Sequence, residues 1–207
     1  ADIANEAPPL INNGVMIYSA GDNQIIALDA KNGKEIWRYV YKLPEGLVPV
    51  HPTNRGVALW EDKIFFGTLD AHLVALDAKT GKELWNKQVA NWEDGYYTTL
   101  APLVVNGKVM TGVSGGEFGI RGFVDAYDAN TGEHAWKTYT IPGPGEPGNE
   151  TWPGDTWQRG GAPIWITRST APQSMPRSSV EVQTTAFRSP RAIAASTLRL
   201  CSAASEP

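Results

Sequence analysis

The stretch with the clearest chemical potential is the glycine-rich segment 111–122, whose sequence is TGVSGGEFGIRG. Its one carboxylate, Glu117, stands among the small residues Ser114, Gly115 and Gly116. Glycine lets a backbone come close to a bound group, and a carboxylate supplies the hard oxygen that a cation such as Ca²⁺ prefers. A plain surface hairpin that carries one Glu is the simpler explanation of this spacing. A cation site here therefore needs support from other residues.

Other kinds of reactive site have no support in the sequence. The three histidines, His51, His72 and His134, are not spaced as metal ligands. A single cysteine, Cys201, excludes an internal disulfide and a cysteine-based metal site. There is no phosphate loop of the G-x-x-x-x-G-K-[ST] type. The net charge of −4 argues against nucleic acid as a partner, and the lack of a long apolar run predicts no membrane span.

A repeated eleven-residue phrase predicts the fold that must position any such site. The phrase reads ALDAKNGKEIW at 27–37, ALDAKTGKELW at 75–85 and AYDANTGEHAW at 126–136. Self-similarity at a period of about 50 residues indicates a propeller, a solenoid or another array of supersecondary units.

Each position of the phrase has a structural role. The alternating apolar run that leads into it predicts a half-buried strand, and its Asp and Gly predict a tight hairpin turn in which the Gly has a positive φ. We expect the Trp that ends the phrase to pack against the neighbouring unit, because one unit cannot bury its own apolar face. These glycines are Gly33, Gly81 and Gly132, and the tryptophans are Trp37, Trp85 and Trp136.

The strand pattern predicts an all-β fold of the β-propeller class. Four short antiparallel strands per unit is the content of a propeller blade, and three blades span about 6–45, 54–92 and 98–141. A Pro/Gly/Trp-rich loop follows, and its tryptophans argue that it is ordered. Residues 1–167 are then one partial propeller.

Residues 168–207 differ in composition from the rest of the chain. They contain no Gly, Asp, Asn, Lys, Tyr or Trp, but eight Ser and five Arg. Either a natural low-complexity tail or a shifted reading frame explains this break, and we favour the shifted frame. In both cases we expect the tail to be disordered.

The repeat and its surroundings resemble the pyrroloquinoline-quinone-dependent alcohol dehydrogenases of the methanol/ethanol quinoprotein family. The phrase A-x-D-A-x-[NT]-G-x-x-x-W is similar to their tryptophan-docking motif, and the most specific similarity lies between Thr98 and Trp157. The resemblance extends from about Glu6 to Thr167. It implies an eight-bladed propeller, of which this chain is an N-terminal fragment with about three blades. It further implies bound pyrroloquinoline quinone (PQQ), a Ca²⁺ or lanthanide ion, and a periplasmic location, although no signal peptide is visible.

The resemblance also implies roles for the residues at which the motifs match. Glu117 corresponds to the metal ligand, and Trp165 corresponds to the indole that forms the floor under the planar quinone. The residues at cofactor-binding positions are Glu6, Arg55, Thr99, Ser114, Gly115, Gly116 and Trp165. The implied reaction oxidises a small primary alcohol to an aldehyde by hydride transfer to the quinone, with cytochrome c as the electron acceptor.

This sequence departs from the family pattern in three ways. Pro49 and Val50 stand where methanol-type members often carry an adjacent Cys pair, and Pro163 stands where some relatives have a hydroxyl residue. The catalytic base of the family lies downstream of Thr167, so we assign no catalytic residue and expect the chain alone to be inactive. Two alternatives stay open: a non-catalytic propeller scaffold of the same repeat superfamily, and a quinoprotein that acts on sugars or polymeric alcohols.

Overall fold

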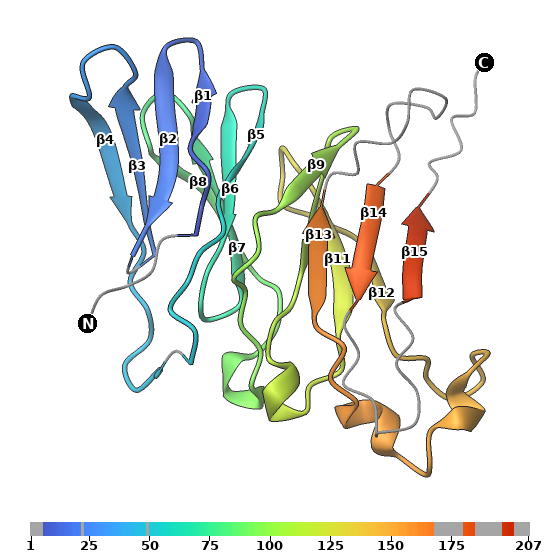
Figure 1. Cartoon of the computed structure of the whole chain (residues 1–207). Helices are drawn as coiled ribbons and strands as arrows, with labels where there is room; N and C mark the ends of the chain where they lie inside the picture. Colours follow the sequence, from blue (N-terminus) through green and yellow to red (C-terminus); the bar gives the residue numbers. More distant parts are fainter. Residues whose placement is uncertain (1–5, 22, 49, 168–179, 185–195, 201–207) are drawn as a thin grey trace, which may run out of the picture.

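Four antiparallel sheets follow one another along the chain in a computed structural model that describes residues 6–21, 23–48, 50–167, 180–184 and 196–200 (Figure 1). The first sheet contains β1 (Leu10–Asn12), β2 (Val15–Ala20), β3 (Gln24–Asp29) and β4 (Glu35–Val40). The second contains β5 (Ala58–Trp60), β6 (Lys63–Gly67), β7 (His72–Asp77) and β8 (Glu83–Gln88). The third contains β9 (Leu103–Val105), β10 (Lys108–Gly112), β11 (Phe123–Asp128) and β12 (His134–Tyr139). The fourth contains β13 (Ile164–Thr167), β14 (Val180–Thr184) and β15 (Ser196–Leu200).

The repeated phrase forms the same hairpin in each of the first three sheets. Each phrase covers the end of one strand, a turn and the start of the next strand, and the pairing slips by one residue at the same place in all three. The turn glycines Gly33, Gly81 and Gly132 have φ values of 74°, 72° and 68°. Left-handed backbone of this kind favours glycine, so the predicted turn chemistry is confirmed.

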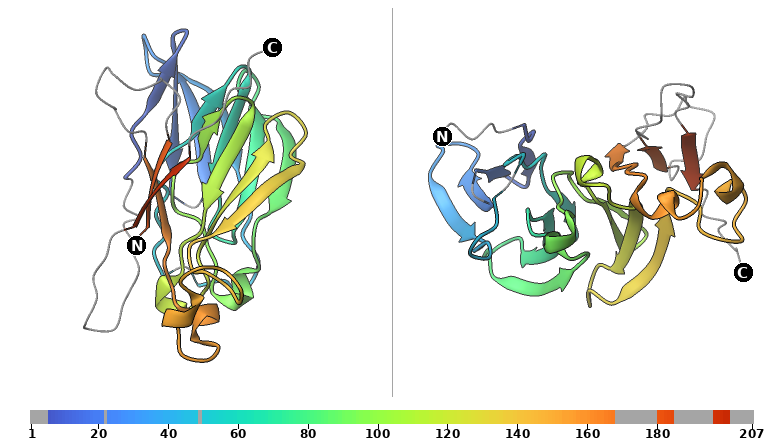
Figure 2. Two further views of the ribbon diagram at one scale, coloured as in Figure 1. Left: turned by 90° about the vertical axis from the view of Figure 1, so that its right-hand side faces the viewer. Right: turned by 90° about the horizontal axis from the view of Figure 1, so that it is seen from below.

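The tryptophans connect neighbouring sheets, as the sequence predicts. The indole Nε1 of Trp37 donates to the carbonyl oxygen of Ala78 at 3.1 Å, and that of Trp85 donates to Ala129 O at 3.3 Å. A Cβ added to Gly81 would lie 2.6 Å from Cε3 of Trp37, so the turn glycine also makes room for the docked ring. Viewed from below, the sheets form an arc around a common axis, which confirms the β-propeller fold class (Figure 2).

The core lies between the sheets. Strands β6 and β7 send alternate side chains to opposite faces, so that Ile64 and Phe66 pack toward the first sheet while Phe65 and Leu73 pack toward the third. All four side chains are fully buried. Alternation of this kind is typical of a sheet that is covered on both faces. The second sheet is consequently packed against a neighbouring sheet on each face.

The long loop that follows β12 contains two short 3-10 helices, η3 (Asn149–Thr151) and η4 (Thr156–Arg159). It lies at the lower end of the sheets, near η1 (Trp92–Asp94) and η2 (Gly116–Phe118) (Figure 1). In the described part of the chain, no helix is long and apolar enough to cross a membrane.

The structure describes two short strands within the tail that the sequence predicts to be disordered. Strands β14 and β15 pair with each other, and β14 pairs with β13. Both strands have short period-two patterns, VEVQT and STLRL, which the unusual composition of the tail obscured. Residues 168–179, 185–195 and 201–207 lie outside the described residues, so for them a disordered or out-of-frame tail stays a prediction.

Candidate functional site

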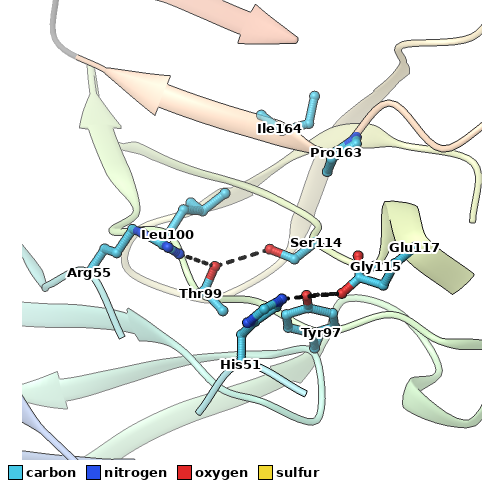
Figure 3. A pocket seen from close by; sticks show the side chains of 10 residues that line it. All are labelled: His51, Arg55, Tyr97, Thr99, Leu100, Ser114, Gly115, Glu117, Pro163 and Ile164. Carbon is cyan, nitrogen blue, oxygen red and sulfur yellow. Dashed lines mark hydrogen bonds and ion pairs between the residues drawn. The ribbon is translucent and has the colours of Figure 1, made fainter. Parts of the chain in front are cut away.

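A cavity of about 220 Å³ is lined by the segments that precede β5 and β9, the segment that follows β10, and the start of β13 (Figure 3). It brings together several of the residues that the sequence singles out, namely Arg55, Thr99, Ser114, Gly115 and Glu117. The other lining residues are His51, Tyr97, Leu100, Pro163 and Ile164. Segments that are more than 100 residues apart in the sequence therefore form one site.

A row of three polar side chains crosses one part of the cavity. Arg55 Nη1 donates to Thr99 Oγ1 at 2.7 Å, and Thr99 Oγ1 lies 3.1 Å from Ser114 Oγ (Figure 3). The backbone N–H of Arg55 also donates to Thr99 O at 2.8 Å, so the two segments are joined twice. A guanidinium beside two hydroxyls is a donor set that suits a carboxylate.

The outer end of this row is occupied by Glu6. Its Oε2 lies 3.0 Å from Arg55 Nη2, and it does not line the cavity described above. The turn that carries Arg55 is fixed by Asn54, whose Oδ1 accepts from Gly56 N at 2.9 Å and whose Nδ2 donates to Gly67 O at 3.0 Å. Glu6 thus holds Arg55 in the row, while the role in quinone contact that the resemblance implies stays a prediction.

Glu117 lies at the other end of the cavity, beside Tyr97 and His51. The hydroxyl of Tyr97 donates to Glu117 Oε1 at 2.5 Å, and His51 Nε2 lies 3.9 Å from the same oxygen. Burial, together with the hydrogen bond to Glu117, raises the pKa of Tyr97 well above its ordinary value. Tyr97 therefore keeps its proton at neutral pH and orients the carboxylate of Glu117.

The donor set around Glu117 is compatible with one side of a cation site. Its side chain is 41% exposed toward the cavity and solvent, so its carboxylate is accessible to a hard cation. No group of three His, Cys, Asp or Glu side chains converges anywhere in the described ranges. Glu117 is the single carboxylate among the described residues that line the cavity.

The glycines of the SGGEFG segment are required by the packing of the protein itself. Gly115 has a φ of 115°, and a Cβ there would lie 2.1 Å from the carbonyl oxygen of Gly95. A Cβ on Gly116 would lie 2.9 Å from Cδ of Pro163. The sequence reasoning explained these glycines by the approach of a bound group, and the structure adds close contacts between chain segments.

One predicted residue, Trp165, and two residues that the sequence did not indicate, Tyr97 and His51, remain to be placed. Trp165 lies on β13 next to the lining residue Ile164, but its side chain lies outside the described part, so its role as a floor stays a prediction. Sequence reasoning missed Tyr97 and treated His51 as unrelated. The available signal for Tyr97 was its place just ahead of Thr98 and Thr99, although its pairing with Ser114 is non-local.

The chain matches a family model described as "PQQ: Glucose/ethanol/alcohol dehydrogenase, beta-propeller domain" over residues 1–174. It is 43% identical over 178 residues to quinoprotein alcohol dehydrogenase PedH of Pseudomonas putida, covering 78% of this chain and 30% of that protein. It is 45% identical over 182 residues to quinohemoprotein alcohol dehydrogenase ADH IIB of the same species, covering 81% of this chain and 26% of that protein.

A solved structure shows the same similarity in three dimensions. The europium-containing methanol dehydrogenase superimposes with a TM-score of 0.76 at 36% identity, covering 88% of this chain and 35% of that one. The chain thus spans only about a third, or less, of the length of each of these relatives.

Proposed function

Because this chain belongs to the family of PQQ-dependent alcohol dehydrogenases, we propose that it forms part of the quinone site of an enzyme that oxidises primary alcohols to aldehydes. The whole enzyme is a longer, eight-bladed propeller to which this chain contributes about three N-terminal blades. We place it in the periplasm, with a small alcohol as substrate and cytochrome c as electron acceptor. The relatives support the substrate class, because their names describe alcohol dehydrogenases.

The observation that carries this proposal is the row Arg55–Thr99–Ser114, with Glu117 in the same cavity. Pyrroloquinoline quinone is a flat molecule with three carboxylates, and a guanidinium with neighbouring hydroxyls is suited to bind such groups. The carboxylate of Glu117 is a suitable ligand for Ca²⁺ or a lanthanide ion. The residues present therefore fit the carboxylates of the quinone and supply one ligand for a metal ion.

The residues of the chain bind and orient, and the cofactor supplies the redox chemistry. A quinone held by Arg55 and Thr99 would supply the hydride acceptor, and a metal ion held by Glu117 would supply Lewis-acid polarisation. Arg55 neutralises carboxylate charge, and Glu6 and Thr99 hold its guanidinium in place. Tyr97 stays protonated, so it fixes the carboxylate of Glu117 and does not act as a base. We assign no catalytic base to this chain.

Titration of the full-length parent enzyme with quinone tests the proposal. Apo-enzyme is titrated with PQQ in the presence of Ca²⁺ or La³⁺, and the absorbance of the bound quinone is followed. We expect saturable binding that depends on the metal, and a loss of at least about tenfold in metal affinity for Glu117→Gln, because a charged ligand is removed. Glu133→Gln, an exposed carboxylate in a hairpin turn, is the matched control and is expected to behave as wild type.

Two results would refute the proposal. One is a parent protein that binds neither quinone nor metal, which would support the scaffold alternative. The other is a parent protein in which Glu117→Gln and Glu133→Gln have the same small effect, which would separate Glu117 from the metal. If the parent enzyme bound quinone saturably but oxidised sugars and not alcohols, the proposed quinone site would stand and the proposed substrate class would be wrong.

A further inference from the structure

Arg121 lies between the candidate site and the long loop at 142–163. Its guanidinium carbon is 3.8 Å from the ring centre of Tyr139 and 4.6 Å from that of Trp157. Its Nε and Nη2 both donate to the carbonyl oxygen of Ile141, at 3.0 and 2.8 Å. Nη2 also lies 3.6 Å from Glu146 Oε2, and the side chain is only 16% exposed. A single side chain thus contacts the strand β12, the start of the loop and the helix η4.

The backbone around Arg121 holds the far end of the same loop. Arg121 pairs with Gly161 in a parallel bridge. Gly161 N donates to Ile120 O at 2.8 Å, and Gly122 N donates to Gly161 O at 2.9 Å. The hydroxyl of Tyr96 accepts from Arg121 N at 3.2 Å, which fixes the segment from the opposite side. Both ends of the loop are therefore attached at one point of the chain.

The end of the loop continues directly into one wall of the cavity. Pro163 and Ile164 follow Gly161 within three residues, and both line the cavity. Pro163 packs closely on Gly116, the neighbour of Glu117, and leaves no room for a Cβ there. The position of this wall relative to Glu117 thus depends on how the loop is closed.

We propose that Arg121 is a positioning residue for the quinone site: its side chain holds the start of the 142–163 loop and η4 beside the backbone bridge at Gly161, and thereby sets the distance between the Pro163–Ile164 wall and Glu117. The inference rests on the proposed function where it concerns the quinone, whereas the contacts between Arg121 and the loop are a property of this chain. The geometry requires an arginine, because a planar guanidinium stacks on aromatic rings while donating two hydrogen bonds to one carbonyl. A lysine has a compact charge without a planar fork and replaces only part of these contacts.

Two measurements on Arg121→Ala and Arg121→Lys test the proposal. The first is limited proteolysis of the 207-residue chain, with mass spectrometry to locate cuts between residues 142 and 160. The second is PQQ titration of the full-length parent at a temperature where circular dichroism shows every variant folded. Arg159→Ala, which removes an exposed arginine of the same loop, is the matched control.

We expect cleavage within the loop to accelerate about tenfold or more in Arg121→Ala, less in Arg121→Lys, and not in Arg159→Ala. We expect the quinone affinity of the parent to fall in the same order, with a shift in the absorption spectrum of the bound quinone. If Arg121→Ala does not fold, Arg121→Lys decides between the outcomes.

If the loop of the Arg121 variants were cleaved at the wild-type rate, the proposal that Arg121 holds the loop would be wrong. Faster cleavage with unchanged quinone affinity and spectrum would overturn the positioning role and leave a purely structural contact. If the wild-type parent binds no quinone, the proposed function fails. The proteolysis measurement then still decides whether Arg121 holds the loop.

Discussion

The docking of a tryptophan on the turn glycine of the next repeat can be tested with one pair of substitutions. Gly33 and Gly81 occupy the same position of the repeated phrase and have nearly the same φ, 74° and 72°. A Cβ added to Gly33 meets no atom within 4 Å, whereas a Cβ added to Gly81 would lie 2.6 Å from Trp37 Cε3. Gly33→Ala is therefore a matched control for Gly81→Ala that differs in the tryptophan contact.

The expected magnitudes follow from this difference. Both variants place an alanine in the left-handed region, which costs about 1–2 kcal/mol of the free energy of unfolding. Gly81→Ala must also displace the indole of Trp37, and overpacking of this kind costs about 1–3 kcal/mol. If the hydrogen bond from Trp37 to Ala78 is broken, about 1 kcal/mol more is lost. We expect Gly81→Ala to be the less stable variant by roughly 1–4 kcal/mol.

Urea denaturation of the 207-residue chain, followed by circular dichroism and by tryptophan fluorescence, measures this difference. The comparison uses midpoints at equal slope, because a change in slope would show that the transition has lost its two-state character. Equal midpoints for Gly33→Ala and Gly81→Ala would show that docking of the Trp37 indole does not require a glycine at position 81. The account of how neighbouring sheets are joined would then be refuted.

Three further predictions concern the site and one turn. Tyr97→Phe keeps the ring but removes the hydrogen bond to Glu117, and metal affinity of the parent, measured by titration, should fall about threefold to tenfold; an unchanged affinity would exclude Tyr97 from orienting the carboxylate. Thr99→Val removes the hydroxyl that accepts from Arg55, so quinone affinity should fall about tenfold; wild-type affinity would show that the row does not bind the quinone. Hydrogen bonds, chiefly from a lysine and two backbone N–H groups, lower the pKa of Asp128 to about 2, and carboxyl NMR should find this value. Because the folded-state pKa is below the unfolded value of about 4, the contribution of Asp128 to stability is present above pH 4 and is lost as the pH falls through 2. Asp128→Asn should remove that part of the pH dependence, and an Asp128 pKa near 4 would contradict the turn geometry.

The fold could be predicted from the sequence because its determinants are local and repeated. Hairpin turns depend on an Asp and a Gly that are four residues apart in each phrase, and the strands depend on period-two alternation. The docking partner of Trp37 was predicted only as the next unit. That the partner is the carbonyl of Ala78 follows from the geometry of two sheets in contact.

The site was partly predictable for a different reason. Arg55, Thr99, Ser114 and Glu117 were assigned through resemblance, and the structure brings them together at one cavity. Tyr97 was missed because its partnership with Glu117 depends on a single bridge between distant segments, which leaves no periodic pattern in the sequence.

The prediction for the tail depends on its composition. Two short alternating runs in the tail form β14 and β15 in the structure. Runs of five residues are too short to be separated from chance by periodicity alone.

We propose that Glu117 binds a metal ion beside a quinone that is held by Arg55 and Thr99. Crystals of the full-length parent loaded with PQQ and a lanthanide would test it through the anomalous signal of the metal. We expect an anomalous peak about 2.3–2.6 Å from the carboxylate oxygens of Glu117, with a quinone carboxylate against Arg55. A metal peak elsewhere in the propeller, with Glu117 facing bulk water, would contradict it.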